Sequence, residues 1–206
     1  TANMGGGTVW PLETIHEVCE VGREHGLRLH LDGARLLNAV VASGVSAADY
    51  ASGFDTAWID LSKGLGCPVG SVLAGNAELI EEIWPWKQRL GGAMRQAGII
   101  AAAGLYALDH HVDRLADDHA NALRFAEGVA SFAGVSVDPS HVDTNIVFFD
   151  VSETGRSGAE ISCALEERGV RIGAMGPTLM RAVTHLDVDA GQVEQALELV
   201  AAELAP

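Results

Sequence analysis

Two short segments place charged side chains directly after predicted strands. The segment "LHLDGAR" puts Asp32 and Arg35 at the end of one strand, and "TAWIDLSKG" puts Ser62 and Lys63 at the end of another. In open α/β sheets, ligands bind beyond the carboxyl ends of the strands. If the two strands are neighbours in one sheet, Asp32 and Lys63 converge on one crevice.

A lysine among glycines could be a phosphate clamp, a covalent catalyst or a solvated turn residue without a role in the chemistry. A phosphate-binding loop does not fit, because its lysine follows the glycines and precedes Ser or Thr, whereas Ser62 precedes Lys63 here. Lys63 and Asp32 can form a structural ion pair. They can also hold pyridoxal phosphate, which needs a lysine for its Schiff base and an acid at its ring nitrogen. The residues alone leave the last two alternatives open.

Alternating helical and strand patterns precede and follow these segments. Residues 11–26 carry apolar side chains at helical spacing, and the next segment, "LRLHLD", alternates as a strand does. Helices and strands continue to alternate to about residue 90, with Ser46 and Asn76 as predicted helix caps. This order predicts an α/β fold with a mostly parallel sheet.

The second half of the chain has a different pattern. Two helices are predicted at about 96–111 and 113–132, followed by the strand candidates "VSV", "NIVFFDV", "VRI" and "LMRAVTH". Ser157 with Glu160, and Asp189 with Gln192, predict capping boxes at two further helices. We therefore expect two domains, residues 1–112 and a small α+β domain over residues 113–206.

The charge, apolar segments and cysteines of the chain exclude several classes of binding partner and of fold. The net charge of −15 disfavours binding to nucleic acid or to anionic membranes. No segment reaches the roughly 18 apolar residues of a membrane-spanning helix. Cys19, Cys67 and Cys163 form no C-x-x-C pair, which argues for a reducing compartment, the cytoplasm, and against a disulfide framework or structural zinc.

Five motifs in order carry a family resemblance. They are "LHLDGARLLNA", "LSKGLGCPVGSVLAGN", "LGGAMRQAGIIAAAGLYAL", "DHANA" and "RAVTHLDV". Together they resemble the low-specificity L-threonine aldolases, which are aspartate-aminotransferase-like (fold type I) pyridoxal-phosphate enzymes close to the β-eliminating lyases. The resemblance implies that residues 1–112 are part of a cofactor-binding large domain and that residues 113–206 are the small C-terminal domain.

The resemblance also assigns roles to five residues. Lys63 would form the Schiff base with pyridoxal 5'-phosphate, and Asp32 would pair with the ring nitrogen. Arg35 would reach the phenolate side of the cofactor or the substrate carboxylate, with a salt bridge at a helix start as the alternative. Arg181 would bind the α-carboxylate of the amino-acid substrate. Arg95 would approach the cofactor phosphate, or would only cap a helix.

The implied activity is cleavage of L-threonine or L-allo-threonine to glycine and an aldehyde, through an external aldimine and a quinonoid. The alternatives are another fold type I reaction, such as β-elimination, and an inactive fragment that needs an N-terminal segment. We expect a homo-oligomer, a dimer or tetramer, by resemblance. The chain starts at Thr1 without Met, so we expect it to be part of a longer protein whose earlier segment supplies phosphate-binding and ring-stacking residues.

The histidines are interpreted structurally. His30 and His185, each on a predicted strand, are read as structural residues rather than as the general base, which stays unidentified. His110, His111 and His119 are read as part of a polar helix surface, and we expect no metal site.

Overall fold

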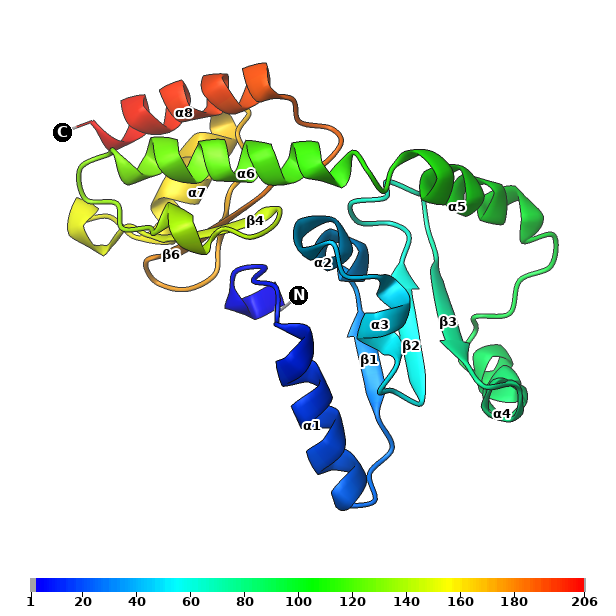
Figure 1. The fold of residues 1–206 in the computed structure, drawn as a ribbon. Helices are drawn as coiled ribbons and strands as arrows, with labels where there is room; N and C mark the ends of the chain where they lie inside the picture. Colours follow the sequence, from blue (N-terminus) through cyan, green and yellow to red (C-terminus); the bar gives the residue numbers. More distant parts are fainter. Residues whose placement is uncertain (1–2, 206) are drawn as a thin grey trace. The chain divides into compact units, whose positions relative to one another are not determined.

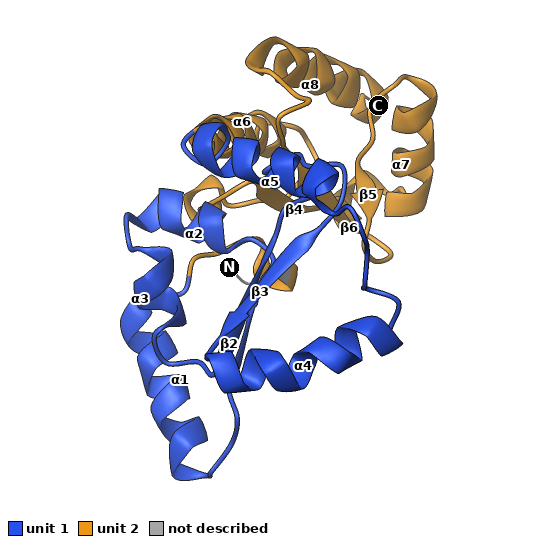
Figure 2. Ribbon diagram, turned by 90° about the vertical axis from the view of Figure 1, so that its right-hand side faces the viewer, with its two compact units in different colours: residues 1, 10–113 blue, residues 2–9, 114–206 orange. Residues whose placement is uncertain are grey.

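The computed structural model describes residues 3–205, which form two compact units (Figure 2). The first unit comprises residues 10–113, and the second comprises residues 114–205 together with residues 3–9. The sequence-based division placed residues 3–9 in the first domain. They belong to the second unit, because the Thr144 hydroxyl donates to the Gly7 carbonyl (2.6 Å) and the Val9 N–H donates to the Asp143 carboxylate (2.9 Å).

The first unit alternates helices with three strands (Figure 1). Its elements are α1 (Leu12–Glu24), β1 (His30–Gly33), α2 (Leu36–Ser43), α3 (Ala47–Ala51), β2 (Thr56–Asp60), β3 (Ser71–Gly75), α4 (Ala77–Arg89) and α5 (Gly98–His110). The predicted caps are confirmed, since Ser46 accepts from the Asp49 N–H and Asn76 accepts from the Leu79 N–H.

The first sheet has the strand order β1-β2-β3. β1 and β2 are parallel, as the sequence pattern predicts, and Asp32 lies opposite Trp58. β3 instead runs antiparallel to β2. The reason is the connection over residues 61–70, which is shorter than the dozen or more residues of a parallel crossover. β1 is also shorter than predicted, and the Leu29 N–H before it donates to the Asp55 carboxylate (2.6 Å).

The second unit is a three-stranded antiparallel sheet with helices on one face (Figure 1). Its elements are η1 (Asn3–Gly5), α6 (Leu115–Ala130), η2 (Pro139–His141), β4 (Ile146–Asp150), η3 (Ser152–Thr154), α7 (Gly158–Glu167), β5 (Gly173–Ala174), β6 (Leu179–Val183) and α8 (Ala190–Leu204). The strand order is β4-β6-β5. Both predicted capping boxes are confirmed, at the start of α7 and of α8.

Two strand predictions in this unit were wrong in extent. "VSV" makes only an isolated bridge between Ser136 and Asp150, and "VRI" precedes the two-residue strand β5. The core is nevertheless continuous, because alternate residues of β4 and β6 face the helices. Buried members of this core include Phe125, Val147, Phe149, Met180 and Val193.

Candidate functional site

Lys63 lies in a tight turn directly after β2. The Gly66 N–H donates to the Lys63 carbonyl (2.8 Å), and Gly66 has a positive φ of 70°, a conformation that favours glycine. The Cys67 N–H then donates to the Leu61 carbonyl (2.9 Å), which closes the loop around the lysine. The local sequence therefore folds so that the backbone at Lys63 is held at the carboxyl end of β2.

The Lys63 ammonium has two neighbours on β2. It forms an ion pair with the Asp60 carboxylate and lies 5.4 Å from the centre of the Trp58 ring. The Lys63 side chain is 36% exposed and that of Asp60 only 11%. Burial disfavours ionisation of Asp60, but hydrogen bonds from Lys63 and Ser62 outweigh it and hold the pKa of the Asp60 carboxyl below its ordinary value. Asp60 is therefore a carboxylate that orients the lysine.

Asp32 lies on the same face of the sheet as this ion pair. Side chains two residues apart on a strand share a face, so Trp58 and Asp60 point to one side. Asp32 is the register partner of Trp58 on the neighbouring parallel strand, and its side chain points to that side as well. Asp32 is exposed and accepts a hydrogen bond from the Ala34 N–H (3.1 Å). Asp32 and the Lys63 ammonium therefore lie on one face of the sheet, near the carboxyl ends of β1 and β2.

Helix α5 supports the lysine turn through a residue that sequence reasoning missed. His111, which follows α5, donates from Nδ1 to the Leu65 carbonyl (2.7 Å). Leu65 and Cys67 are buried in a cluster with Leu61 and Ala107. The sequence pattern predicts a place for His111 on a polar helix surface, but His111 is half-buried and fixes the turn. No local sequence signal pairs it with a residue 46 positions earlier.

The remaining predicted arginines of the first unit lie in different surroundings. Arg35 is half-buried and is the N-cap residue of α2, two positions beyond β1. Arg95 is exposed in the connection between α4 and α5. Arg35 thus follows Asp32 by three residues, just beyond the end of β1, whereas Arg95 lies on a loop.

Arg181 belongs to the second unit and lies on β6. Its neighbours Met180 and Ala182 are buried toward the helices, so Arg181 points to the opposite face of the sheet. There it is the cross-strand partner of Phe148 on β4. Its side chain is only partly buried.

Two of the other histidines differ in their hydrogen bonding. His30 Nδ1 lies 2.7 Å from the Thr56 hydroxyl. His185 Nδ1 is buried without a hydrogen-bond partner among the described residues, since the Asp187 carboxylate lies 3.7 Å away. Burial lowers the pKa of His119, against the opposing effect of the Asp118 carboxylate. Across residues 3–205, no group of three or more His, Cys, Asp or Glu side chains is arranged to hold a metal ion.

One face of the first sheet presents two of the groups that bind pyridoxal phosphate, an amine and a carboxylate. An amine and a carboxylate stand on the same face of two neighbouring parallel strands, at their carboxyl ends. Gly33 brings the two strands close, since a Cβ there would lie 2.0 Å from the Trp58 carbonyl oxygen. These residues fit the cofactor as the lysine and the acid at its ring nitrogen.

Comparison with known proteins defines the class. The family model of the beta-eliminating lyases matches residues 1–154. The chain therefore belongs to the beta-eliminating lyase family. Among curated relatives, the low-specificity L-threonine aldolase of Escherichia coli (strain K12) is 42% identical over 193 residues, which are 94% of this chain and 56% of that protein. Low-specificity L-threonine aldolase 1 of Arabidopsis thaliana is 38% identical over 197 residues, which are 95% of this chain and 55% of that protein.

Solved structures show the same fold. A Listeria monocytogenes protein provisionally assigned as an L-allo-threonine aldolase has a TM-score of 0.79 at 23% identity, covering 98% of this chain and 59% of that one. A threonine aldolase of Leishmania major has a TM-score of 0.72 at 18% identity, covering 95% and 57%. The predicted fold class, part of a fold type I large domain with a small C-terminal α+β domain, is confirmed. The chain spans a little over half the length of these relatives.

The described helices give no candidate for a membrane span, since none combines the required length with sufficient apolarity.

Proposed function

We propose that the protein containing this chain is a pyridoxal-phosphate-dependent aldolase that cleaves L-threonine, L-allo-threonine and related β-hydroxy-α-amino acids to glycine and an aldehyde. The observation that carries the proposal is the position of Lys63 and Asp32 on one face of β1 and β2. The similarity to L-threonine aldolases over almost the whole chain supports the choice of reaction.

Lys63 and Asp32 are proposed to hold the cofactor. When bound, pyridoxal phosphate supplies an electron sink for the bond that breaks at the substrate Cα. Lys63 binds it covalently through Nζ, and the negative charge of Asp32 keeps a proton at the ring nitrogen. Arg35, at the start of α2, contacts the phenolate side or the substrate carboxylate. Arg95 contacts the phosphate in this proposal.

Asp60 is proposed to position Lys63 rather than to act as its base. A lysine must lose its proton before it attacks a carbonyl, and a neighbouring carboxylate could in principle accept that proton. The lowered pKa of Asp60 makes it a poor acceptor, while its contact with Nζ restricts where the lysine points. Asp60 therefore contributes orientation, and the general base for the β-hydroxyl is another group.

Arg181 is proposed to bind the substrate α-carboxylate. A guanidinium can hold a carboxylate with two parallel hydrogen bonds, which a lysine cannot do. Two-point binding would fix which Cα bond lies in line for cleavage. We further propose a cytoplasmic homo-oligomer, a dimer or tetramer, from the resemblance of the chain to its family and from its unpaired cysteines.

The test is the variant Lys63→Ala in the full-length protein, with Lys87→Ala as the control. Lys87 lies on α4, with its ammonium 4.8 Å from the centre of the Trp84 ring, outside the proposed site. We expect Lys63→Ala to abolish the visible absorbance of the lysine-bound cofactor and to reduce kcat by at least about 100-fold, while Lys87→Ala keeps both. Retained cleavage in Lys63→Ala would show that the assignment is wrong.

The family also contains β-eliminating members, so product analysis separates the two reactions. Aldol cleavage of L-threonine releases glycine and acetaldehyde in equal amounts. β-Elimination of water would instead release ammonia and a 2-oxo acid. Detection of the second set alone would replace the aldolase proposal with the lyase alternative.

A further inference from the structure

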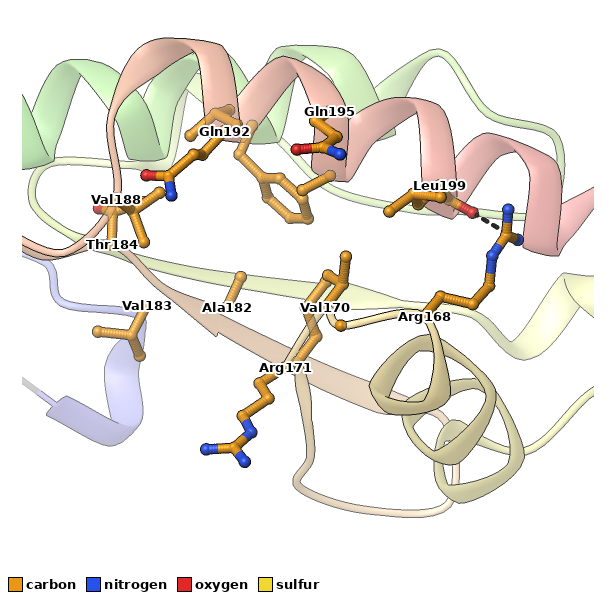
Figure 3. A pocket seen from close by; sticks show the side chains of 15 residues that line it. Arg168, Val170, Arg171, Ala182, Val183, Thr184, Val188, Gln192, Gln195 and Leu199 are labelled. Carbon is orange, nitrogen blue, oxygen red and sulfur yellow. Dashed lines mark hydrogen bonds between the residues drawn. The ribbon is translucent and has the colours of Figure 1, made fainter.

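The second unit contains a pocket of about 270 Å³ between α8 and β6 (Figure 3). Phe125, Ile172, Ala182 and Val193 line it and are themselves buried, so its walls belong to the core of the unit. The pocket therefore extends from the surface into the apolar layer between the helices and the sheet.

Small side chains create this space. Ala182 on β6 and Ala196 on α8 both line the pocket, one on the sheet and one on the helix. Larger residues at either position would fill the space between the two elements, as side chains do in a close-packed interior. The open volume therefore depends on the small side chains of Ala182 and Ala196.

The edge of β6 contributes unpaired main-chain groups. The Thr184 N–H donates to the carbonyl of Asn145 (3.0 Å), the residue before β4, so the main-chain groups of Val183 point to the β5 side. Pairing with β5 stops at Gly173 opposite Arg181. Among the described residues no hydrogen bond from the Val183 main chain to the segment before β5 is formed. Val183 therefore offers one N–H and one C=O at the pocket wall.

Side-chain amides supply further polar groups. Gln192 and Gln195 lie along α8 at the pocket (Figure 3). The side-chain oxygen of Gln192 accepts from the Asp189 N–H (2.9 Å) in the capping box, which leaves its NH₂ group as a donor. These groups are neutral hydrogen-bond donors and acceptors.

The two arginines at the pocket are already paired with glutamates. Arg168 donates to the Leu199 carbonyl (3.3 Å) and lies 3.6 Å from the Glu203 carboxylate. Arg171 lies 3.4 Å from the Glu166 carboxylate, and its guanidinium points away from the pocket in Figure 3. The lining includes no Asp, Glu or Lys. A charged ligand would therefore lose hydration without gaining an opposite charge.

We propose that this pocket is a binding site for a neutral small molecule that combines an aromatic ring with a carboxamide. The ring would occupy the apolar space beside Phe125, Ala182 and Val193. The carboxamide, with its own donor and acceptor, would bind the main chain of Val183 and the NH₂ group of Gln192. A cavity of about 150 Å³ accommodates benzene, so a substituted ring fits the present volume.

The test uses benzamide as the probe and the full-length protein labelled with ²H and ¹⁵N. We expect benzamide to shift the resonances of the Val183 main-chain amide and the Gln192 side-chain amide, with a Kd of about 0.1–1 mM for so small a ligand. Benzoate has the same size but carries a charge, and we expect it to bind at least about 10-fold more weakly. Equal or tighter binding of benzoate would overturn the assignment of a neutral ligand.

A matched pair of variants on α8 tests the location. Ala196→Leu fills the pocket and should weaken benzamide binding by at least about 10-fold, whereas Ala201→Leu makes the same change outside the lining and should leave it unchanged. NOEs from the benzamide ring to Phe125 and Val193 in the unmodified chain test the location without any variant. Absence of resonance shifts at about 10 mM benzamide, or binding that Ala196→Leu does not affect, would overturn the proposal.

Discussion

At the scale of single residues, the environment of Lys63 is set by opposing electrostatic effects on Asp60. Burial alone would raise the pKa of the Asp60 carboxyl, because removal from water disfavours its charged form. The Lys63 ammonium and the Ser62 hydroxyl and N–H reverse that effect. The result is a carboxylate that stays charged to a lower pH than an ordinary aspartate, beside the lysine that the proposed chemistry requires.

The pKa of Asp60 should therefore respond to its neighbours in a definite order. Lys63→Met removes the larger of the lowering effects, so the pKa of Asp60 should rise more than it does in Ser62→Ala. The measurement is a titration of the Asp60 side-chain carboxyl followed by ¹³C NMR. A larger rise in Ser62→Ala than in Lys63→Met would contradict the dominant role of the ion pair.

The same lowered pKa predicts how stability depends on pH. The pKa of Asp60 is lower when folded than the value of about 3.9 for an unfolded chain, so its charged form stabilises the fold. That contribution is complete above about pH 5 and is lost as pH falls through the folded value. The difference in melting temperature between the unmodified chain and Asp60→Asn should shrink over that acidic range.

At the scale of elements, the spacing of β1 and β2 positions Asp32 relative to Lys63. The two strands are parallel neighbours, and Gly33 permits their close approach beside Trp58. Ala107 of α5 packs with Leu65 of the turn after β2, and His111 donates a hydrogen bond to the Leu65 carbonyl. The site is therefore built on strands and a helix, and only its lysine turn is a loop.

Gly33→Ala should separate these strands. The added Cβ would lie 2.0 Å from the Trp58 carbonyl oxygen, so the backbone must shift at a cost of about 1–3 kcal/mol in the free energy of unfolding. Gly98→Ala, at the start of α5, meets no atom within 4 Å and should be neutral or slightly stabilising. Thermal unfolding followed by circular dichroism measures both. Equal stability of the two variants would contradict the close approach at Gly33.

At the scale of the whole molecule, the two units differ in how much apolar surface they bury. The core cluster of the second unit extends over α6, α7, α8, β4 and β6. In the first unit the corresponding cluster contains Leu61, Leu65, Cys67 and Ala107, while every residue of β3 is exposed. Apolar side chains such as Val72 and Tyr106 are also exposed there, at 49% and 59%.

Hydrogen exchange should reflect this difference. We expect the slowest-exchanging amides in β4, β6 and α6, and faster exchange in β3 and α4, because local opening costs less where few apolar contacts are lost. Mass spectrometry of peptides after deuterium labelling provides the comparison within one sample. Equal or greater protection of β3 would show that the first unit buries its strand in solution, for example against another chain.

Much of the local structure follows from the sequence because it depends on neighbouring residues. Ser46, Asn76, Ser157 and Asp189 cap helices as predicted, since a cap involves a side chain and a backbone N–H only a few positions apart. The end of the strand at Asp32 and the end of the strand before Lys63 were predictable for the same reason. The first follows an alternating segment and the second an apolar segment, and each leads into glycine. The motifs around them also carried the family resemblance.

Other features were decided only by the tertiary structure, because they join residues far apart in the chain. The contact of His111 with Leu65, the antiparallel course of β3 and the packing of residues 3–9 with the second unit have no local signal. The ion pair of Lys63 with Asp60 is local. The position of both side chains on the same face as Asp32, however, depends on the pairing of β1 with β2. The sequence by itself thus determined which residues could do the chemistry, and long-range strand and helix contacts decided how they are held together.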